Sequence, residues 1–226
     1  MFADLSARLA EVRDRIHSAL SRSGHSQRVT VISVTKTFGP EAVRAVAQAG
    51  LTDVGENKVQ EALAKQEQTR DIAVNWHLIG HLQRNKVKSL AHFHTFHALD
   101  SSRLADAIDG WAAPQQMRIR ALVQVNVAGE ETKGGFSLAE LPAEAERLRA
   151  RTGLEIRGAM TMAPYDAPEP VLRRCFAGAR SARDMLAAAG HPATELSMGM
   201  SHDFEIAVEE GATLVRLGTI LFGDRS

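Results

Sequence analysis

The sequence contains one cysteine, one tyrosine and no excess of either charge. The single cysteine, Cys175, excludes a disulfide within the chain and fits a reducing compartment. Because Cys175 lies in a helical pattern, we expect it to pack in the core. Lysine and arginine together number 27, as do aspartate and glutamate, so the positive surplus that nucleic acids require is missing. We therefore expect no nucleic acid partner.

Long apolar runs are also missing from the sequence. The first residues carry charges at Asp4, Arg8, Glu11 and Arg13, which excludes the apolar segment of a secretory signal at this point. Nowhere does an apolar window approach the roughly 20 residues that span a bilayer. These absences predict a soluble protein of the cytoplasm with no membrane partner.

Eight strand-like runs alternate with helical patterns along the chain. They are VTVISV (29–34), LTDVG (51–55), NWHLIG (75–80), FHTFHAL (93–99), RIRALVQVNV (118–127), LEIRGAMTM (154–162), TELSMGM (194–200) and ATLVRLG (212–218). Strands that alternate with helices form mostly parallel sheets, because each parallel return needs a crossover. Residues 1–22 carry an apolar stripe at spacings of three and four, which predicts an additional N-terminal helix.

Eight such units in 226 residues predict an α/β protein with a closed (β/α)8 barrel of the TIM type. We expect one domain over 1–226, with the helix of residues 1–22 packed on the barrel. An open doubly wound sheet would show the same alternation. No glycine-rich nucleotide motif follows any strand, however, so the barrel is the better interpretation.

Lys36 directly follows a strand in the segment VISVTKTFGP (31–40). A buried ammonium is costly unless it is paired or neutralised. Lys36 is therefore either a lysine whose stem lies on apolar surface with its head in water, or an amine placed to attack a carbonyl. This residue alone does not decide between the two.

Polar residues stand at several other predicted strand ends, which is where barrels of this type carry their sites. Besides Lys36 they are Asn57, His77, Asn126, Ser201, Arg216, Gly218 and Thr219. Barrels often bind phosphate after strands seven and eight, and GTILFG (218–223) is long enough for the short helix of such a site. Alternatively Ser201 caps the preceding helix and Gly218-Thr219 turn the chain. Asp203 counts against a bound anion.

A lysine and a phosphate cradle at one barrel mouth are the two anchors that pyridoxal 5′-phosphate requires. Arg216 lies two residues before Gly218 on the same strand, so both point to one side. A guanidinium only donates hydrogen bonds, so an arginine beside the pyridine nitrogen would leave that nitrogen unprotonated. Such a ring is a weak electron sink.

Several motifs resemble the pyridoxal phosphate homeostasis protein family, the YggS/PROSC group, which is related to the N-terminal barrel of alanine racemase (fold type III). The motifs are VTK (34–36), VGENKVQE (54–61), WHLIGHLQRNK (76–86), NVAGEETKGGF (126–136), GAMTM (158–162), LSMGMSHDFEIAVEEGATLVRLGT (196–219) and LFG (221–223). The resemblance implies that Lys36 holds the cofactor as a Schiff base. It also implies roles for six further residues: Ser201, Gly218 and Thr219 at the phosphate, Arg216 at the pyridine nitrogen, Asn57 at the ring, and His77 near the pocket.

Two functions from different classes remain at this stage. In one, the protein buffers pyridoxal phosphate or delivers it to apo-enzymes that use it, without a dedicated substrate. In the other it is a pyridoxal phosphate-dependent amino-acid racemase, which needs a second base opposite Lys36. Alanine racemase supplies that base from a second domain, which we do not expect after Ser226. Tyr165 lies in a proline-rich loop, so we expect a carrier.

The remaining expectations concern metals and oligomeric state. His92, His94 and His97 are close in sequence, but spacing along a strand puts only His92 and His94 on one face. We therefore expect no metal site. Without the second domain, which forms the dimer of the racemase, a monomer is expected.

Overall fold

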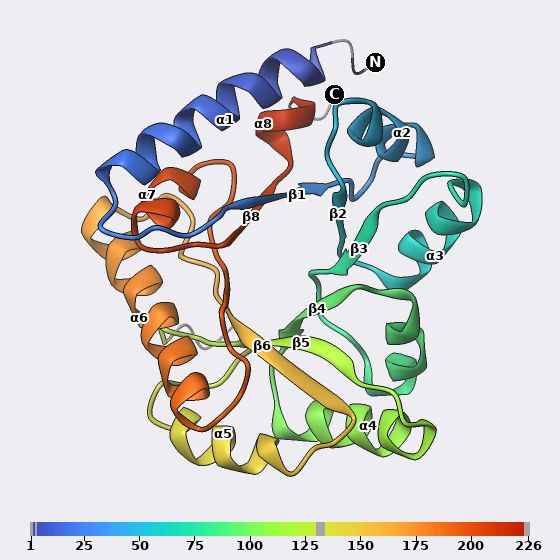
Figure 1. Cartoon of the computed structure of the whole chain (residues 1–226), viewed down its shortest axis with the longest axis vertical. Helices are drawn as coiled ribbons and strands as arrows, with labels where there is room; N and C mark the ends of the chain where they lie inside the picture. Colours follow the sequence, from blue (N-terminus) through green and yellow to red (C-terminus); the bar gives the residue numbers. More distant parts are fainter. Residues whose placement is uncertain (1, 3, 130–133, 224–226) are drawn as a thin grey trace.

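The computed structural model describes residues 2, 4–129 and 134–223. Eight parallel strands close into a barrel in sequence order, β1 to β8, and helices surround it (Figure 1). The strands are β1 (Thr30–Val34), β2 (Asp53–Glu56), β3 (Asn75–Leu78), β4 (Thr95–Leu99), β5 (Ile119–Gln124), β6 (Leu154–Met160), β7 (Glu195–Ser197) and β8 (Leu214–Leu217). The predicted (β/α)8 barrel is confirmed.

The helices follow the strands in the order that the sequence pattern predicts. The α-helices are α1 (Leu5–Arg22), α2 (Pro40–Gln48), α3 (Val59–Gln68), α4 (Ser102–Ala112), α5 (Leu141–Arg149), α6 (Glu169–Ala188), α7 (Phe204–Glu209) and α8 (Thr219–Phe222). The 3-10 helices are η1 (Arg84–His92) and η2 (Ala113–Gln115). The basic residues Arg84, Lys86 and Lys88 lie in η1, which follows β3.

The first and last strands close the barrel. β1 pairs with β8 in a register from Thr30 opposite Leu214 to Ser33 opposite Leu217. Just beyond this seam the ring of Phe2 packs edge-on against the rings of Phe38 and Phe222, with centroids 5.7 Å and 5.6 Å apart. Segments from both ends of the chain therefore lie side by side next to the C-terminal end of β1 (Figure 1).

Helix α1 lies outside the β/α repeat and covers α7 and α8 (Figure 1). Its buried side chains follow the predicted spacing of three and four and are Leu5, Leu9, Val12, Ile16 and Ala19. Two ion pairs fix its polar edge to α7, from Arg15 to Glu205 at 2.6 Å and from Arg22 to Glu209 at 2.7 Å. The long apolar repeat of this helix is thus explained by burial against the last two helices.

A bulge in the barrel wall depends on Gly158. The pairing of β5 with β6 shifts between Ala121 and Leu122, opposite this residue. Its φ is +154°, and a Cβ atom there would lie 1.8 Å from the carbonyl oxygen of Glu195 on β7. No L-amino acid side chain fits this position without movement of the backbone.

Gly158→Ala is accordingly expected to lower the free energy of unfolding by about 1–3 kcal/mol, the usual cost of a strained backbone position. Urea denaturation followed by circular dichroism measures this change. Gly110→Ala is the matched control, because Gly110 lies in α4 with nothing within 4 Å of its virtual Cβ. It should stabilise the helix slightly. Equal stability of the two variants would contradict the role given to the bulge.

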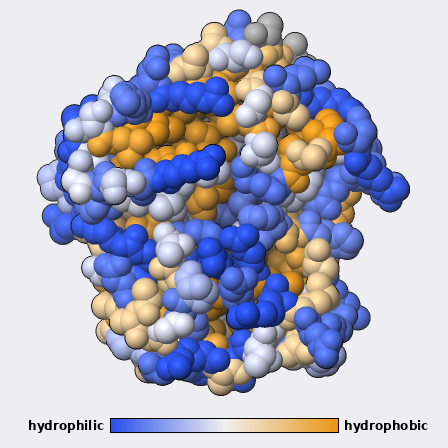
Figure 2. Space-filling model, viewed as in Figure 1, coloured by the Kyte–Doolittle hydropathy of each residue, from blue (hydrophilic) through white to orange (hydrophobic). Residues whose placement is uncertain are grey.

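The face of the molecule seen in Figure 2 is largely hydrophilic. Figure 2 shows apolar surface mainly in recesses between hydrophilic side chains, in the orientation of Figure 1. Among the described residues Tyr165 is the large apolar side chain that is exposed. None of the helices in the described ranges has the length and apolar character needed to cross a membrane.

Candidate functional site

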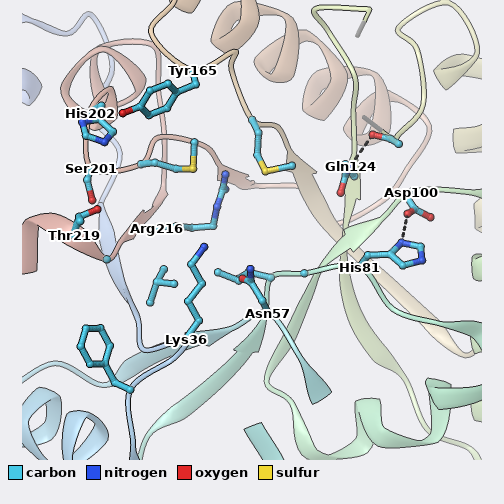
Figure 3. Close-up of a pocket in the computed structure, with 18 of the residues that line it drawn as sticks. Lys36, Asn57, His81, Asp100, Gln124, Tyr165, Ser201, His202, Arg216 and Thr219 are labelled. Carbon is cyan, nitrogen blue, oxygen red and sulfur yellow. Dashed lines mark hydrogen bonds and ion pairs between the residues drawn. The ribbon is translucent and has the colours of Figure 1, made fainter. Parts of the chain in front are cut away.

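A cavity of about 690 Å³ opens at the C-terminal ends of the strands. Its walls come from segments that follow almost every strand, and Figure 3 shows Lys36 pointing into its middle. Ser201 and Thr219 stand at one end, and His81 and Asp100 stand at the other (Figure 3). The residues that line it are Val34, Lys36, Phe38, Asn57, Ile79, Gly80, His81, Asp100, Gln124, Gly134, Met162, Tyr165, Met200, Ser201, His202, Arg216, Gly218, Thr219 and Gly223.

Six of the seven predicted cofactor-binding residues lie in this lining. They are Lys36, Asn57, Ser201, Arg216, Gly218 and Thr219. The structure does not bring His77 to the cavity, because its ring is buried inside the barrel, where it contacts Asp53 and His97. Asn126 is also absent from the lining, since β5 ends two residues earlier and presents Gln124 instead.

The turn that carries Lys36 is constrained by the residues on either side of it. Thr35 directly follows β1 and is buried, and Thr37 has a left-handed φ of +70°. The backbone oxygen of Thr35 accepts a hydrogen bond of 2.7 Å from the buried ammonium of Lys65 on α3. The backbone on either side of Lys36 is therefore constrained, and its side chain extends into the cavity from a fixed base.

The ammonium of Lys65 also forms a buried ion pair with Glu56. The distance from Lys65 Nζ to Glu56 Oε1 is 2.5 Å, and the same carboxylate oxygen accepts a hydrogen bond of 2.6 Å from the hydroxyl of Thr35. Glu56 Oε2 is buried without a hydrogen-bond partner in the described ranges. Because Asn57 follows Glu56 directly, this pair joins the two strand ends that carry Lys36 and Asn57.

The end of the cavity near β7 and β8 presents hydroxyl groups and backbone N–H groups. Ser201 Oγ lies 3.3 Å from the backbone nitrogen of Ile220, in the first turn of α8, and accepts its N–H. Ser201 therefore connects the two loops rather than capping α7, which was the alternative interpretation. Gly218 and Thr219 form the start of α8 beside it.

Asp203 does not enter the cavity lining. Its carboxylate accepts a hydrogen bond of 2.5 Å from the backbone nitrogen of Met200, in the loop that leads into α7. Burial raises the pKa of Asp203, although the Met200 N–H opposes that shift. The objection that Asp203 would repel an anion is weakened because the side chain turns back to its own loop.

Arg216 extends from β8 into the centre of the cavity. Its Nη1 donates to Ser197 Oγ at 2.6 Å, and its Nη2 donates to the backbone oxygen of Thr161 at 2.9 Å. The residue is 5% exposed. Burial lowers the pKa of Arg216 to about 10, with the charge of Asp203 opposing the shift, so the guanidinium remains charged at neutral pH.

The far end of the cavity contains residues that sequence reasoning did not select. His81 Nδ1 lies 2.9 Å from Asp100 Oδ2, and Asp100 Oδ1 accepts from Ser101. Gln124 donates to the backbone oxygen of Gly134 at 2.6 Å. The rule that barrel sites lie at the C-terminal ends of the strands could have identified Gln124 and Asp100, which lie at or directly after the ends of β5 and β4. Residues 130–133 of the motif NVAGEETKGGF lie outside the described residues.

Comparisons with known proteins support one family. The model of the alanine racemase N-terminal domain matches residues 8–226. The pyridoxal phosphate homeostasis protein of Aquifex aeolicus (strain VF5) is 43% identical over 222 residues, which cover 96% of this chain and 97% of the relative. The chain belongs to the pyridoxal phosphate homeostasis protein family. The member from Escherichia coli (strain K12) is 36% identical and covers 98% of this chain, with 97% of the relative covered.

Solved structures agree with the family assignment. PipY of Synechococcus elongatus PCC7942, with PLP bound, is 36% identical, has a TM-score of 0.84, and covers 97% of this family member, with all of PipY covered. Alanine racemase of Clostridium difficile 630 is 15% identical with a TM-score of 0.78, covering 98% of this chain and 57% of the racemase. At that identity the likeness shows the fold alone.

Tyr165 lies at the cavity mouth of this family member and is 74% exposed. Its ring packs edge-on against His202, with centroids 5.4 Å apart. Its hydroxyl points toward His202 and not toward Lys36 (Figure 3).

The three clustered histidines of the sequence separate in the fold. His92 ends η1 at the surface, His94 pairs with Arg120 at 3.1 Å, and His97 lies inside the barrel. In the part of the chain that the structure describes, no three His, Cys, Asp or Glu side chains are placed to hold a metal ion.

Proposed function

We propose that this protein binds pyridoxal 5′-phosphate through a Schiff base on Lys36 and acts in the homeostasis of that cofactor. The observation that carries the proposal is the placement of one lysine, one buried arginine and a pair of hydroxyl groups around a single cavity. Membership of the family supports it, as does the PLP-bound structure of PipY. The site serves to buffer the cofactor or deliver it, and no dedicated substrate is needed.

The chemistry of the donor set fits each part of the cofactor. Pyridoxal phosphate brings an aldehyde that condenses with amines, and Lys36 is the amine at the centre of the cavity. Arg216 offers N–H donors for the pyridine nitrogen, while Ser201, Thr219 and the backbone at Gly218 surround the phosphate position. Apolar side chains and Asn57 line the space for the ring; the apolar ones are Val34, Ile79 and Met162.

The first experiment is the visible absorbance of the purified protein before and after borohydride, followed by mass mapping of peptides. We expect a yellow protein that borohydride bleaches, with a pyridoxyl mass on the Lys36 peptide. A protein that stays colourless after pyridoxal phosphate is added would contradict the proposal. An assay of amino-acid racemisation then separates a carrier from a racemase.

Ser201→Ala tests the phosphate end of the site. Loss of a hydrogen bond to a charged group costs about 1.5 kcal/mol or more, so the affinity for pyridoxal phosphate should fall about tenfold. Fluorescence titration measures this affinity. The affinity for pyridoxal, which has no phosphate, should not change. An equal loss for both ligands would show that Ser201 acts on the fold of the loops and not on the phosphate.

Location, oligomeric state and protein partners form the remaining part of the proposal. We place the protein in the cytoplasm as a monomer and a single domain over 1–226, handing its cofactor to apo-enzymes. The sparse apolar surface supports the monomer, since stable interfaces usually bury contiguous apolar patches. A dimer in size-exclusion chromatography with light scattering would overturn it.

A further inference from the structure

Four polar side chains inside the barrel form a continuous hydrogen-bonded series that ends at Arg216. We name Asp53, His77, His97 and Ser197 the barrel network. Asp53 Oδ1 lies 2.9 Å from His77 Nε2, His77 Nδ1 lies 2.9 Å from His97 Nε2, and His97 Nδ1 lies 2.9 Å from Ser197 Oγ. Ser197 Oγ then accepts the 2.6 Å bond from Arg216. Barrel interiors are usually filled by branched apolar side chains, so this interior is unusual.

The barrel network runs from one end of the barrel to the other. Asp53 is the first residue of β2, whereas Arg216 stands beside the cavity at the opposite end of the strands. His97 and Ser197 belong to β4 and β7, which are not neighbours in the sheet, so the bond between them crosses the interior. His97 and Ser197 are fully buried. Groups buried in this way are costly unless every donor and acceptor is paired.

Hydrogen-bonding capacity fixes the direction of every bond. Arginine only donates, so Ser197 accepts from Arg216, and the carboxylate of Asp53 only accepts, so His77 donates to it from Nε2. With one proton on each ring, His77 Nδ1 then accepts from His97 Nε2. His97 Nδ1 is left as an acceptor, and the hydroxyl of Ser197 donates to it. All four bonds are satisfied when both rings are neutral.

The charges at the two ends agree with this direction. Burial of the ring, reinforced by the positive charge of Arg216, lowers the pKa of His97 well below its ordinary value, so the ring is neutral. Burial disfavours the ionised form of Asp53, but hydrogen bonds from His77, Thr52 and Asn75 outweigh it and lower the pKa of Asp53 to about 2. The barrel network therefore links an anion at Asp53 to the cation at Arg216.

Arg216 has no carboxylate among its hydrogen-bond partners in the described ranges. Both acceptors of its guanidinium are neutral, Ser197 Oγ and the backbone oxygen of Thr161. These two bonds hold Nη1 and Nη2 on the barrel side and leave other N–H groups for an acceptor in the cavity. Ser197, which accepts one of these two bonds, is itself held by the rest of the barrel network.

We propose that Asp53, His77, His97 and Ser197 are positioning residues that fix the plane of the Arg216 guanidinium and keep its remaining donors directed at the pyridine nitrogen of the cofactor. The proposal rests on the proposed function for its ligand. It deepens that function because the state of the pyridine nitrogen in the bound ring then depends on residues that do not touch the ring. It also gives a role to His77, which sequence reasoning placed at the cavity itself.

The arrangement of protons is tested without any cofactor. In ¹H–¹⁵N spectra of protein labelled at its histidines, two slowly exchanging rings should be neutral and carry the proton on Nε2. A buried ring that is charged or protonated on Nδ1 would overturn the direction derived above. Because the apo protein is used, this result does not depend on whether the proposed function is correct.

The effect on the site is tested with cofactor labelled with ¹⁵N at the pyridine nitrogen. Ser197→Ala should shift the pyridine resonance and weaken cofactor binding about tenfold. Ser33→Ala is the matched control: Ser33 is also a fully buried serine on a barrel strand, but its hydroxyl has no partner in the described ranges. It should change neither quantity. An unchanged resonance in Ser197→Ala, or an equal shift in Ser33→Ala, overturns the proposal.

Asp53→Asn provides a remote variant in case Ser197→Ala does not fold. It removes the charge at the far end while keeping an acceptor for His77, so a smaller pyridine shift in the same direction is expected. No shift would overturn the role of the network beyond Ser197. Failure of the wild-type protein to bind cofactor refutes the proposed function instead, and leaves the histidine result standing.

Discussion

Lys36→Ala is expected to abolish the yellow colour of the cofactor-loaded protein and its trapping by borohydride. The variant lacks the amine that condenses with the aldehyde, while the arginine and the hydroxyl groups of the cavity remain. Affinity for pyridoxal phosphate should fall by roughly 100-fold, which corresponds to about 2.7 kcal/mol. Weak binding that depends on the phosphate should persist in equilibrium dialysis.

Lys36→Arg separates the covalent bond from the charge. It keeps a cation at the same turn but cannot form the Schiff base, so it should lose the colour and retain more affinity than Lys36→Ala. Borohydride trapping on another lysine peptide in Lys36→Ala would refute the assignment of Lys36. Complete loss of binding in both variants would show that the phosphate end contributes little.

Lys65→Met is expected to lower the free energy of unfolding by about 3–5 kcal/mol, because it leaves the buried carboxylate of Glu56 without its counter-charge. Glu56 Oε2 has no hydrogen-bond partner in the described part of the chain, and Oε1 would keep only the hydroxyl of Thr35, so little remains to compensate. Urea denaturation measures the loss. The double variant Lys65→Met, Glu56→Gln should recover part of it, since the buried charge is then gone.

Lys58→Met is the control for this measurement. Lys58 also pairs with a glutamate, Glu61 at 2.9 Å, but the lysine side chain is 72% exposed. Exposed pairs contribute little to stability, so no measurable change is expected. Similar destabilisation by both substitutions would mean that burial of the Lys65–Glu56 pair is not the cause.

The sequence alone was sufficient to predict the barrel and the residues that reach the cavity from β8 and from the end of β1. Strand and helix patterns alternate clearly, and the rule that sites lie at the C-terminal strand ends selects Lys36 and Arg216 without coordinates. His77 shows the limit of that rule. It is the third residue of β3, one before the end of the strand, and its side chain belongs to the layer below the cavity.

The barrel network could not have been found from the sequence. His97 and Ser197 come together because β4 and β7 face each other across a closed barrel, and no local pattern encodes that meeting. The Lys65–Glu56 pair was missed for a similar reason. A lysine in a helix ordinarily keeps its charge in water, and only the packing of α3 on the strand ends puts this one inside.

The seam between β1 and β8 has a consequence for the order in which the protein can mature. Lys36 is synthesised early, whereas Arg216 and Thr219 belong to the last strand and the turn after it. A ribosome-bound chain can hold neither a closed barrel nor a complete cavity until that strand has emerged. The complete cavity therefore forms only when β8 pairs with β1, after every other strand of the barrel has been made.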